Sequence, residues 1–241
     1  MHKSTTVVDR IMMTLSVVLG GGSVLLLASM GSIQLVHLGF SDPIALLWDA
    51  ILSFAFFLQH SVMVRKPFRA RMGVLIPPYY HGAIYSIASG VVLIIVVVLW
   101  QQSETQLLRL EGLPFWIARG CSLLAILISA WGIYALGSID FFGLRPIKVH
   151  IRGQSDQPSL FVIRGPYRWV RHPLYFCVLM LIWASPELTA DRLLFNVLWT
   201  AWIVAGTILE ETDLLADFGD VYRDYQQKVP MLIPWRGRRQ I

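Results

Sequence analysis

Four long apolar stretches constrain this chain more than any other feature of its sequence. They fall at about residues 11–33, 43–64, 82–100 and 113–136. Each approaches or exceeds the roughly 20 residues that an α-helix needs to cross the hydrocarbon core of a bilayer. Of the 241 residues, 56% are hydrophobic and only 15% are charged, which is more apolar and less charged than soluble domains are. The sequence therefore predicts an all-α, polytopic integral membrane protein with four spanning helices in its first half.

A polar loop of 35 residues, 137–171, separates these stretches from a second apolar region. The centre of the loop, residues 153–159, is rich in Gly, Ser, Gln and Pro, which predicts a flexible turn between two more ordered halves. Residues 173–185 are apolar but would form a helix of only about 20 Å. Residues 192–209 return as a longer apolar run. We predict a membrane helical hairpin in which the first arm is short or tilted.

The tail that follows the hairpin is amphipathic. Over residues 213–228 the large apolar side chains recur on one helical face: Leu214, Leu215, Phe218, Val221, Tyr222 and Tyr225. This pattern predicts a short cytoplasmic helix that lies on the membrane or folds over a neighbouring site. We accordingly divide the chain into a four-span bundle, residues 1–136, and a C-terminal region, residues 137–241, with the loop, hairpin and tail.

The third apolar stretch has a face of small residues. Gly82, Ser86 and Gly90 recur at intervals of four residues, which places them on one side of a helix. Small residues at this spacing let another helix approach closely. We therefore expect a helix–helix contact along this face.

The positive charge follows membrane topology. Seventeen of the 20 Lys and Arg residues lie in residues 1–10, 64–79 and 137–171 or after Glu211, and the other three, Arg109, Arg119 and Arg192, lie in or near the alternate loops. By the positive-inside rule, both termini and the loop 137–171 are predicted to be cytoplasmic. The net charge of +5 is explained by topology and gives no reason to expect a nucleic-acid partner.

The cysteines and histidines do not predict a metal site. Cys121 and Cys177 fall in separate predicted membrane helices, where two thiols are more often structural than a disulfide or a metal pair. The six histidines have no zinc-like spacing. We predict no resident metal.

One segment gathers charges of both signs with aromatic residues at a membrane edge. Arg164–Tyr175 contains three arginines, a histidine and three aromatic residues, and the hairpin returns Glu210–Glu211 to the same side. Adjacent carboxylates are costly at a membrane edge unless they meet cations or hydrogen-bond donors. Arg168, Arg171 and His172 are the expected partners. Two interpretations stay open at this point, a site for a zwitterionic ligand and a purely structural ion cluster.

Three motifs together resemble the isoprenylcysteine carboxyl methyltransferase-like and phospholipid methyltransferase-like membrane enzymes. They are Arg171-His-Pro-Leu-Tyr175, the glutamate pair that 34 residues separate from Tyr175, and Phe218-Gly-Asp-Val-Tyr-Arg-Asp-Tyr225. The resemblance covers about residues 137–235. Within that group the chain is most similar to bacterial methanethiol S-methyltransferases at three further segments: Phe141-Phe-Gly-Leu-Arg145, Gln59-His-Ser-Val-Met63 and Val229-Pro-Met-Leu-Ile-Pro234.

The resemblance implies a membrane methyltransferase that uses S-adenosylmethionine. Arg168, His172 and the amides at the helix start around Pro173 suit the carboxylate of this cofactor, and the glutamate pair suits its ammonium or ribose. Aromatic rings suit its adenine or its sulfonium. No glycine-rich strand-to-helix turn is present, which excludes a Rossmann-type methyltransferase. The implied cofactor-binding residues are Gly165, Tyr167, Arg168, Arg171, His172, Pro173, Leu174, Tyr175, Glu210 and Glu211.

The methyl acceptor that the resemblance favours is a small thiol such as methanethiol, which would give dimethyl sulfide. A nearby cation would favour the reactive thiolate, and Arg145 and His60, at the cytoplasmic ends of spans, are the catalytic candidates. Each residue also suits a non-catalytic role: Arg145 as a positive charge that sets membrane topology, and His60 as a histidine at the membrane interface. Where the bacterial enzymes usually have a glutamine and an acidic–basic pair, this chain has Pro146 and Tyr79-Tyr-His-Gly82. These differences bear on the identity of the methyl acceptor more than on the identity of the cofactor.

Three alternatives stay open from the sequence. The first is a methyltransferase for a prenylated or phospholipid acceptor. The second is a sterol-type reductase that uses a nicotinamide cofactor, although such enzymes typically carry asparagine where this chain has Leu174. The third is a non-enzymatic membrane accessory protein of nitrogen-oxide metabolism. The implied location is the inner (cytoplasmic) membrane of a bacterium, with membrane lipids and a thiol or lipophilic acceptor as partners and an undetermined oligomeric state.

Overall fold

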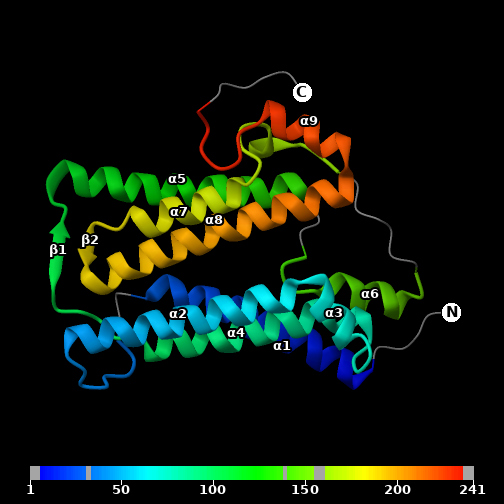
Figure 1. Ribbon diagram of the computed structural model, residues 1–241, viewed down its shortest axis with the longest axis horizontal. Helices are drawn as coiled ribbons and strands as arrows, with labels where there is room; N and C mark the ends of the chain where they lie inside the picture. Colours follow the sequence, from blue (N-terminus) through cyan, green and yellow to red (C-terminus); the bar gives the residue numbers. More distant parts are fainter. Residues whose placement is uncertain (1–5, 31–33, 138–139, 155–160, 236–241) are drawn as a thin grey trace. The chain divides into compact units, whose positions relative to one another are not determined.

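We describe the protein from a computed structural model, which describes residues 6–30, 34–137, 140–154 and 161–235. Regular structure in these residues is almost entirely helical, as the sequence predicts. The chain forms two compact units, which we treat separately (Figure 1).

Unit 1 contains residues 1–103 and 140–158, and unit 2 contains residues 104–139 and 159–241. The units are interleaved along the chain, because the fourth apolar helix belongs to unit 2 and the segment after it belongs to unit 1. The sequence suggests a division at residue 136 between a membrane bundle and a functional region. Compactness does not test a division by function, so this division stays a prediction.

Unit 1 is a bundle in which α4 packs against both α1 and α2. Its α1 begins four residues before the predicted stretch because Thr6 caps it: the Thr6 hydroxyl accepts from the amide of Asp9, and the Asp9 carboxylate accepts from the amide of Thr6. The elements of unit 1 are α1 (Val7–Ser29), α2 (Asp42–Val64), α3 (Lys66–Met72), η1 (Pro78–Tyr80), α4 (His81–Leu99) and α6 (Leu144–Arg152).

The small-residue face of α4 is a helix contact, as predicted. A Cβ atom on Gly90 would lie 2.5 Å from the carbonyl oxygen of Leu19 in α1, and one on Gly82 would lie 2.8 Å from Cα of Gly143. Ser86 donates a hydrogen bond of 3.2 Å to a backbone carbonyl of α1. Larger residues at these positions would force the helices apart.

Unit 2 is built around α7, which packs against both α5 and α8. Strands β1 and β2 pair antiparallel, with Leu108 opposite Leu188, and each strand leads directly into a long helix. The sequence did not predict this small sheet. The elements of unit 2 are β1 (Gln106–Arg109), α5 (Gly112–Leu136), η2 (Gly165–Arg168), α7 (Pro173–Trp183), β2 (Glu187–Thr189), α8 (Ala190–Phe218) and α9 (Asp220–Lys228).

The predicted hairpin is present, but its second arm is longer than expected. The first arm, α7, has 11 residues and is a short apolar helix, as predicted. The second arm, α8, continues nine residues past Leu209 to Phe218, because no Gly or Pro lies between Leu209 and Gly219. Gly219 has a φ of +57°, a conformation that favours glycine, and α9 begins directly after it. The tail predicted as one helix over residues 213–228 is therefore divided at this glycine.

The long polar loop has the two ordered halves that the sequence predicts. Helix α6 lies in the first half and η2 in the second. The centre of the predicted turn, residues 155–159, lies outside the described residues.

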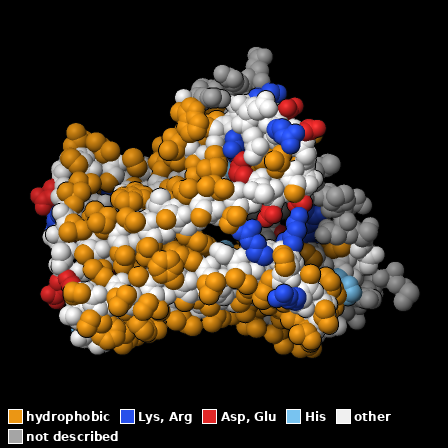
Figure 2. All heavy atoms as spheres, viewed as in Figure 1, with side chains coloured by type: hydrophobic (Ala, Val, Ile, Leu, Met, Phe, Trp, Pro, Cys, Tyr) orange, Lys and Arg blue, Asp and Glu red, His pale blue; other side chains and the backbone are white. Residues whose placement is uncertain are grey.

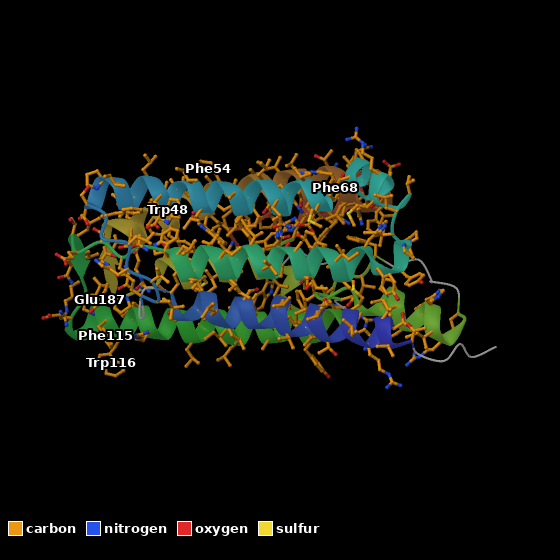
Figure 3. The ribbon with its side chains drawn as sticks, turned by 90° about the horizontal axis from the view of Figure 1, so that it is seen from below. Trp48, Phe54, Phe68, Phe115, Trp116 and Glu187 are labelled. Atoms are coloured by element: carbon orange, nitrogen blue, oxygen red, sulfur yellow. The ribbon has the colours of Figure 1, made fainter. Side chains whose placement is uncertain are left out.

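Among the described residues, five helices are long and apolar enough to cross a membrane: α1, α2, α4 together with η1, α5 and α8. On the face that Figure 2 shows, hydrophobic side chains cover the flanks of the helices and charged side chains gather near their ends. Phe54 on α2 and Trp116 on α5 are 58% and 70% exposed and point away from their helices (Figure 3). These apolar flanks identify a multi-pass membrane protein.

Candidate functional site

The segment before α7 is held against α5 by a required glycine. Gly165 has a φ of +55°, and a Cβ atom there would lie 2.7 Å from Cβ of Ala135. Pro166 is buried beside it, and the ring of Trp169 meets that of Trp131 edge to face at 5.3 Å. These contacts fix the short helix η2, which carries Tyr167 and Arg168.

Glu211 is the centre of the polar cluster in unit 2. Its Oε1 accepts hydrogen bonds from Arg171 Nε at 2.8 Å, His172 Nε2 at 2.6 Å and the Tyr222 hydroxyl at 2.7 Å. Its Oε2 accepts from Arg171 Nη2 and from Gln226 Nε2, both at 2.7 Å. A carboxylate offers about four lone-pair positions, so these five donors occupy all of them. Glu211 has no capacity left for a ligand.

Arg171 is equally committed to protein partners. Besides its two bonds to Glu211, its Nη1 donates to the backbone carbonyls of Gln226 and Val229. Its backbone amide donates to the carbonyl of Pro230 at 2.9 Å. The side chain is only 10% exposed. Arg171 therefore fastens the end of α9 and the residues after it to the start of α7.

His172 is buried and presents one ring nitrogen to its surroundings. Its Nε2 lies 2.6 Å from Glu211, which accepts hydrogen bonds only, so Nε2 carries the proton of this contact. The other nitrogen, Nδ1, lies 3.8 Å from Oε2 of Glu210. In the neutral ring Nδ1 is therefore a hydrogen-bond acceptor. The ring stacks on that of Tyr175, with 5.5 Å between centroids and 5° between planes.

Glu210 differs from Glu211 in exposure and in partners. Its side chain is 43% exposed, and its Oε2 accepts from the Tyr175 hydroxyl at 2.7 Å. Burial, together with the charge of Glu210, raises the pKa of Tyr167 to about 12, so this hydroxyl stays protonated at neutral pH. Arg168, at the end of η2, is exposed and has no hydrogen-bond or ion-pair partner among the described residues. Of the three predicted cationic partners, Arg171 and His172 bind Glu211, and Arg168 does not.

The start of α7 adds a positive helix end to this edge. Pro173 is buried at the first position of the helix, where the missing amide costs nothing. Leu174 packs against Gly132 of α5, since a Cβ atom at Gly132 would lie 3.1 Å from its Cδ2. The amides of the first helical turn have no acceptor within the helix. An anion at this end would meet both these amides and the helix dipole.

Tyr222, Tyr225 and Gln226 of α9 contact the candidate site, which the sequence did not reveal. Tyr222 and Gln226 both bind Glu211, and the Tyr225 hydroxyl donates to the carbonyl of Tyr167 at 2.5 Å. The sequence pattern assigned the two tyrosines to an apolar face. The available signal was that this face carried two hydroxyls, which need partners when they are buried.

The two acceptor-side candidates belong to unit 1. His60 lies on α2, where its Nε2 is 2.5 Å from the hydroxyl of Tyr85 on α4. Arg145 is the second residue of α6 and is half-buried; its backbone amide donates to Asp140 at 2.8 Å. Their catalytic roles stay predictions.

Comparison with curated proteins finds relatives over most of the chain. It is 38% identical to methanethiol S-methyltransferase of Pseudomonas deceptionensis, over 81% of this chain and 75% of that protein. It is 31% identical to methanethiol S-methyltransferase of Mycobacterium tuberculosis, over 80% of each chain. The chain belongs to this family. A more distant relative is Nurim of Rattus norvegicus, 26% identical over 70% of this chain and 68% of that protein. No family model and no solved structure matches the chain.

Membership of the methanethiol S-methyltransferase family confirms the resemblance and identifies the chain as a methyltransferase. A methyltransferase needs a methyl donor, so a reductase and a non-enzymatic accessory role lose their support. In this family member, Glu210 is 43% exposed and lies 3.8 Å from Nδ1 of the buried His172, and the exposed Arg168 comes four residues before His172 in the chain. In the adjoining cluster, Glu211 is fully occupied by hydrogen-bond donors from the protein.

Proposed function

We propose that this chain is an integral membrane methyltransferase that transfers the methyl group of S-adenosylmethionine to methanethiol and releases dimethyl sulfide. The observation that carries the proposal is that the partly exposed Glu210 lies 3.8 Å from Nδ1 of His172, the residue before α7, with the exposed Arg168 four residues earlier in a chain of this family. A cofactor with a carboxylate and an ammonium on one carbon needs such a pair of opposite charges.

The residues fit the amino-acid part of S-adenosylmethionine. Glu210 Oε2 and His172 Nδ1 are two acceptors 3.8 Å apart, which suits an ammonium group between them. Arg168 and the first-turn amides of α7 suit the carboxylate. In this proposal His172 binds the ammonium, although the sequence suggested the carboxylate. In this proposal Glu211 and Arg171 do not contact the cofactor and instead hold the surrounding residues in place.

The aromatic side chains of the same edge suit the rest of the cofactor. Tyr175 and Trp169 are 37% and 45% exposed, and Tyr167 is half-buried beside them. S-adenosylmethionine supplies an electrophilic methyl group on a sulfonium, whose positive charge aromatic faces attract. Gly165, Pro173 and Leu174 hold the backbone around these rings.

The acceptor must lose its thiol proton before its sulfur attacks the methyl carbon. We propose that Arg145 stabilises the thiolate and that His60 accepts the proton, with its ring held by the hydroxyl of Tyr85. In the transfer the new sulfur–carbon bond forms as the bond between the methyl group and the sulfonium breaks. Positioning of the two reactants then accounts for most of the rate.

We propose that both termini, the loop 137–171 and the site face the cytoplasm, in the inner membrane of a bacterium. The split of basic residues supports this orientation. In a background without Cys121 and Cys177, single cysteines at Gln154 and Glu104 should react with an impermeant thiol reagent from opposite sides. Labelling of both positions from the periplasm would contradict the proposed orientation.

Turnover by the purified protein tests the function directly. The full chain in lipid nanodiscs, given methyl-labelled S-adenosylmethionine and methanethiol, should release labelled dimethyl sulfide into the headspace. The Glu210→Gln variant is the matched negative control, since it keeps the size of the side chain. Methylation of prenylated or phospholipid acceptors, with methanethiol left untouched, would show that the acceptor is a lipid and that the small-thiol proposal is wrong.

A further inference from the structure

Tyr222 of α9 is the largest fully buried side chain in the described residues, at 1% exposure. Its hydroxyl donates to Oε1 of Glu211 at 2.7 Å. Burial and this hydrogen bond raise the pKa of Tyr222 above its ordinary range, so the hydroxyl remains a donor at every physiological pH. Loss of the phenolic proton therefore does not break this contact within that range.

The ring of Tyr222 is held separately from its hydroxyl. Phe161 meets the ring edge to face at 5.6 Å, and Tyr225 meets it at 5.8 Å. Val229 completes the buried cluster of this helix. A phenylalanine in place of Tyr222 would keep this packing and lose only the hydrogen bond.

The hydroxyl of Tyr222 and the imidazole of His172 share one acceptor atom. Oε1 of Glu211 accepts from both of them, at 2.7 Å and 2.6 Å. The position of this oxygen determines where Nε2 of His172 must point. It thereby determines the direction of Nδ1, on the opposite side of the ring.

We infer that Tyr222 is a positioning residue of the cofactor site, which acts through Glu211 to hold His172 with Nε2 protonated and Nδ1 turned toward Glu210. The backbone of His172 is held by the same part of the chain, because its amide donates to the carbonyl of Met231 at 3.0 Å. Ring and backbone of His172 thus both depend on residues after α8. The inference rests on the proposed function, since it assigns a role within that site.

The test compares Tyr222→Phe with Tyr134→Phe, the same change at an 85% exposed tyrosine of α5. Calorimetry measures the affinity for S-adenosylhomocysteine, and NMR of ¹⁵N-histidine reports the tautomer of His172, whose signal is the one that His172→Gln removes. Tyr222→Phe should bind S-adenosylhomocysteine about tenfold more weakly, as expected for the loss of one bond to a charged group. It should raise KM for the cofactor by the same factor and leave kcat at saturation nearly unchanged. Tyr134→Phe should match the wild type.

The NMR spectrum decides the inference even if Tyr222→Phe is unstable. Wild-type protein should show His172 protonated at Nε2, and a wild-type spectrum with the proton on Nδ1 overturns the inference. Unchanged affinity and an unchanged His172 signal in a folded Tyr222→Phe variant would also overturn it. If the wild type fails to bind S-adenosylhomocysteine while Tyr222→Phe still alters the His172 signal, the proposed function is wrong and the positioning role stands.

Discussion

Two neighbouring carboxylates of α8 have different surroundings. Glu211 is 9% exposed and receives five hydrogen bonds from the protein, whereas Glu210 is 43% exposed and receives one from Tyr175. Consecutive residues of an α-helix point about 100° apart, so one of the pair faces the interior of unit 2 and the other faces its edge. Two adjacent acids of one motif therefore differ in capacity: Glu211 is fully occupied by protein donors, and Glu210 is the one that we propose for ligand binding.

The burial pattern of α8 explains the division. Ile203, Thr207 and Glu211 recur at intervals of four residues and are all buried, so they lie on one face of the helix. Glu210 lies beside this face. Arg171, His172, Tyr222 and Gln226 all donate to Glu211 on the buried face, whereas Glu210 accepts from Tyr175 of α7 and stays 43% exposed.

When the two acids are substituted one at a time, the largest expected difference is in the stability of the protein. Glu211→Gln leaves the buried guanidinium of Arg171 without its counter-charge, which should cost about 3–5 kcal/mol of unfolding free energy. For a chain of this size the thermal midpoint should fall by roughly 10 °C. Thermal unfolding in detergent measures this change, with Glu210→Gln as the matched control. Equal midpoints for the two variants would show that the acids do not differ as described.

The next effect is on cofactor affinity. Glu210→Gln should weaken binding of S-adenosylmethionine by about 1.5–3 kcal/mol, because an amide cannot replace a carboxylate opposite an ammonium. Its thermal midpoint should stay close to that of the wild type. Calorimetry measures the affinity, and Glu187→Gln, at an exposed strand residue, is the control. Unchanged affinity in a folded Glu210→Gln protein would remove this residue from the site.

A smaller effect is expected on the acceptor side. Arg145→Met should lower turnover with thiols about tenfold, or about 1.4 kcal/mol, and spare cofactor affinity. The loss should shrink as the pH rises toward the thiol pKa, because free thiolate then becomes abundant. Turnover measured across pH, with Lys148→Met on the same helix as the control, tests this. A loss that is equal at every pH would assign Arg145 to structure.

The smallest effect is expected at Arg168, the exposed cation that we propose for the carboxylate of the cofactor. Arg168→Gln should weaken cofactor binding by about 1 kcal/mol, since an exposed charge is screened by solvent. Added salt should weaken the wild type toward the variant. Arg164→Gln, at an exposed arginine on the same segment, is the control. Identical losses in both variants would point to a general charge effect and leave the carboxylate without a specific partner.

Much of the fold could be predicted from hydrophobic length alone. The apolar stretches became helices because each satisfies its own backbone hydrogen bonds. The end of α8 could not be predicted this way, since polar residues such as Asp213 and Asp217 continue the helix past the apolar run. Gly219 is the residue at which the helix ends, and it ends the helix through its positive φ, which the sequence does not specify.

Two of the three predicted partners of the glutamate pair contact it, whereas the geometry of those contacts could not be predicted. Charge arithmetic indicated that Arg171 and His172 would meet the glutamate pair, and they do. The different roles of Glu210 and Glu211 depend on helix phase and on α9, and the sequence pattern contained neither. The contact of Tyr222 was hidden because a tyrosine counts as apolar in a periodicity pattern.

The attachment of residues 222–231 to Glu211, Arg171 and His172 also has a consequence for biosynthesis. The ribosome makes these residues after α5, α7 and α8, at about 5–20 residues per second. The helices can therefore enter the bilayer before the carboxylate of Glu211 has its full set of donors. A nascent chain that stops before Gly219 would lack the two hydrogen bonds that Tyr222 and Gln226 donate to Glu211. The polar cluster around Glu211 is thus complete only after residues 222–231 have been made and have packed against the start of α7.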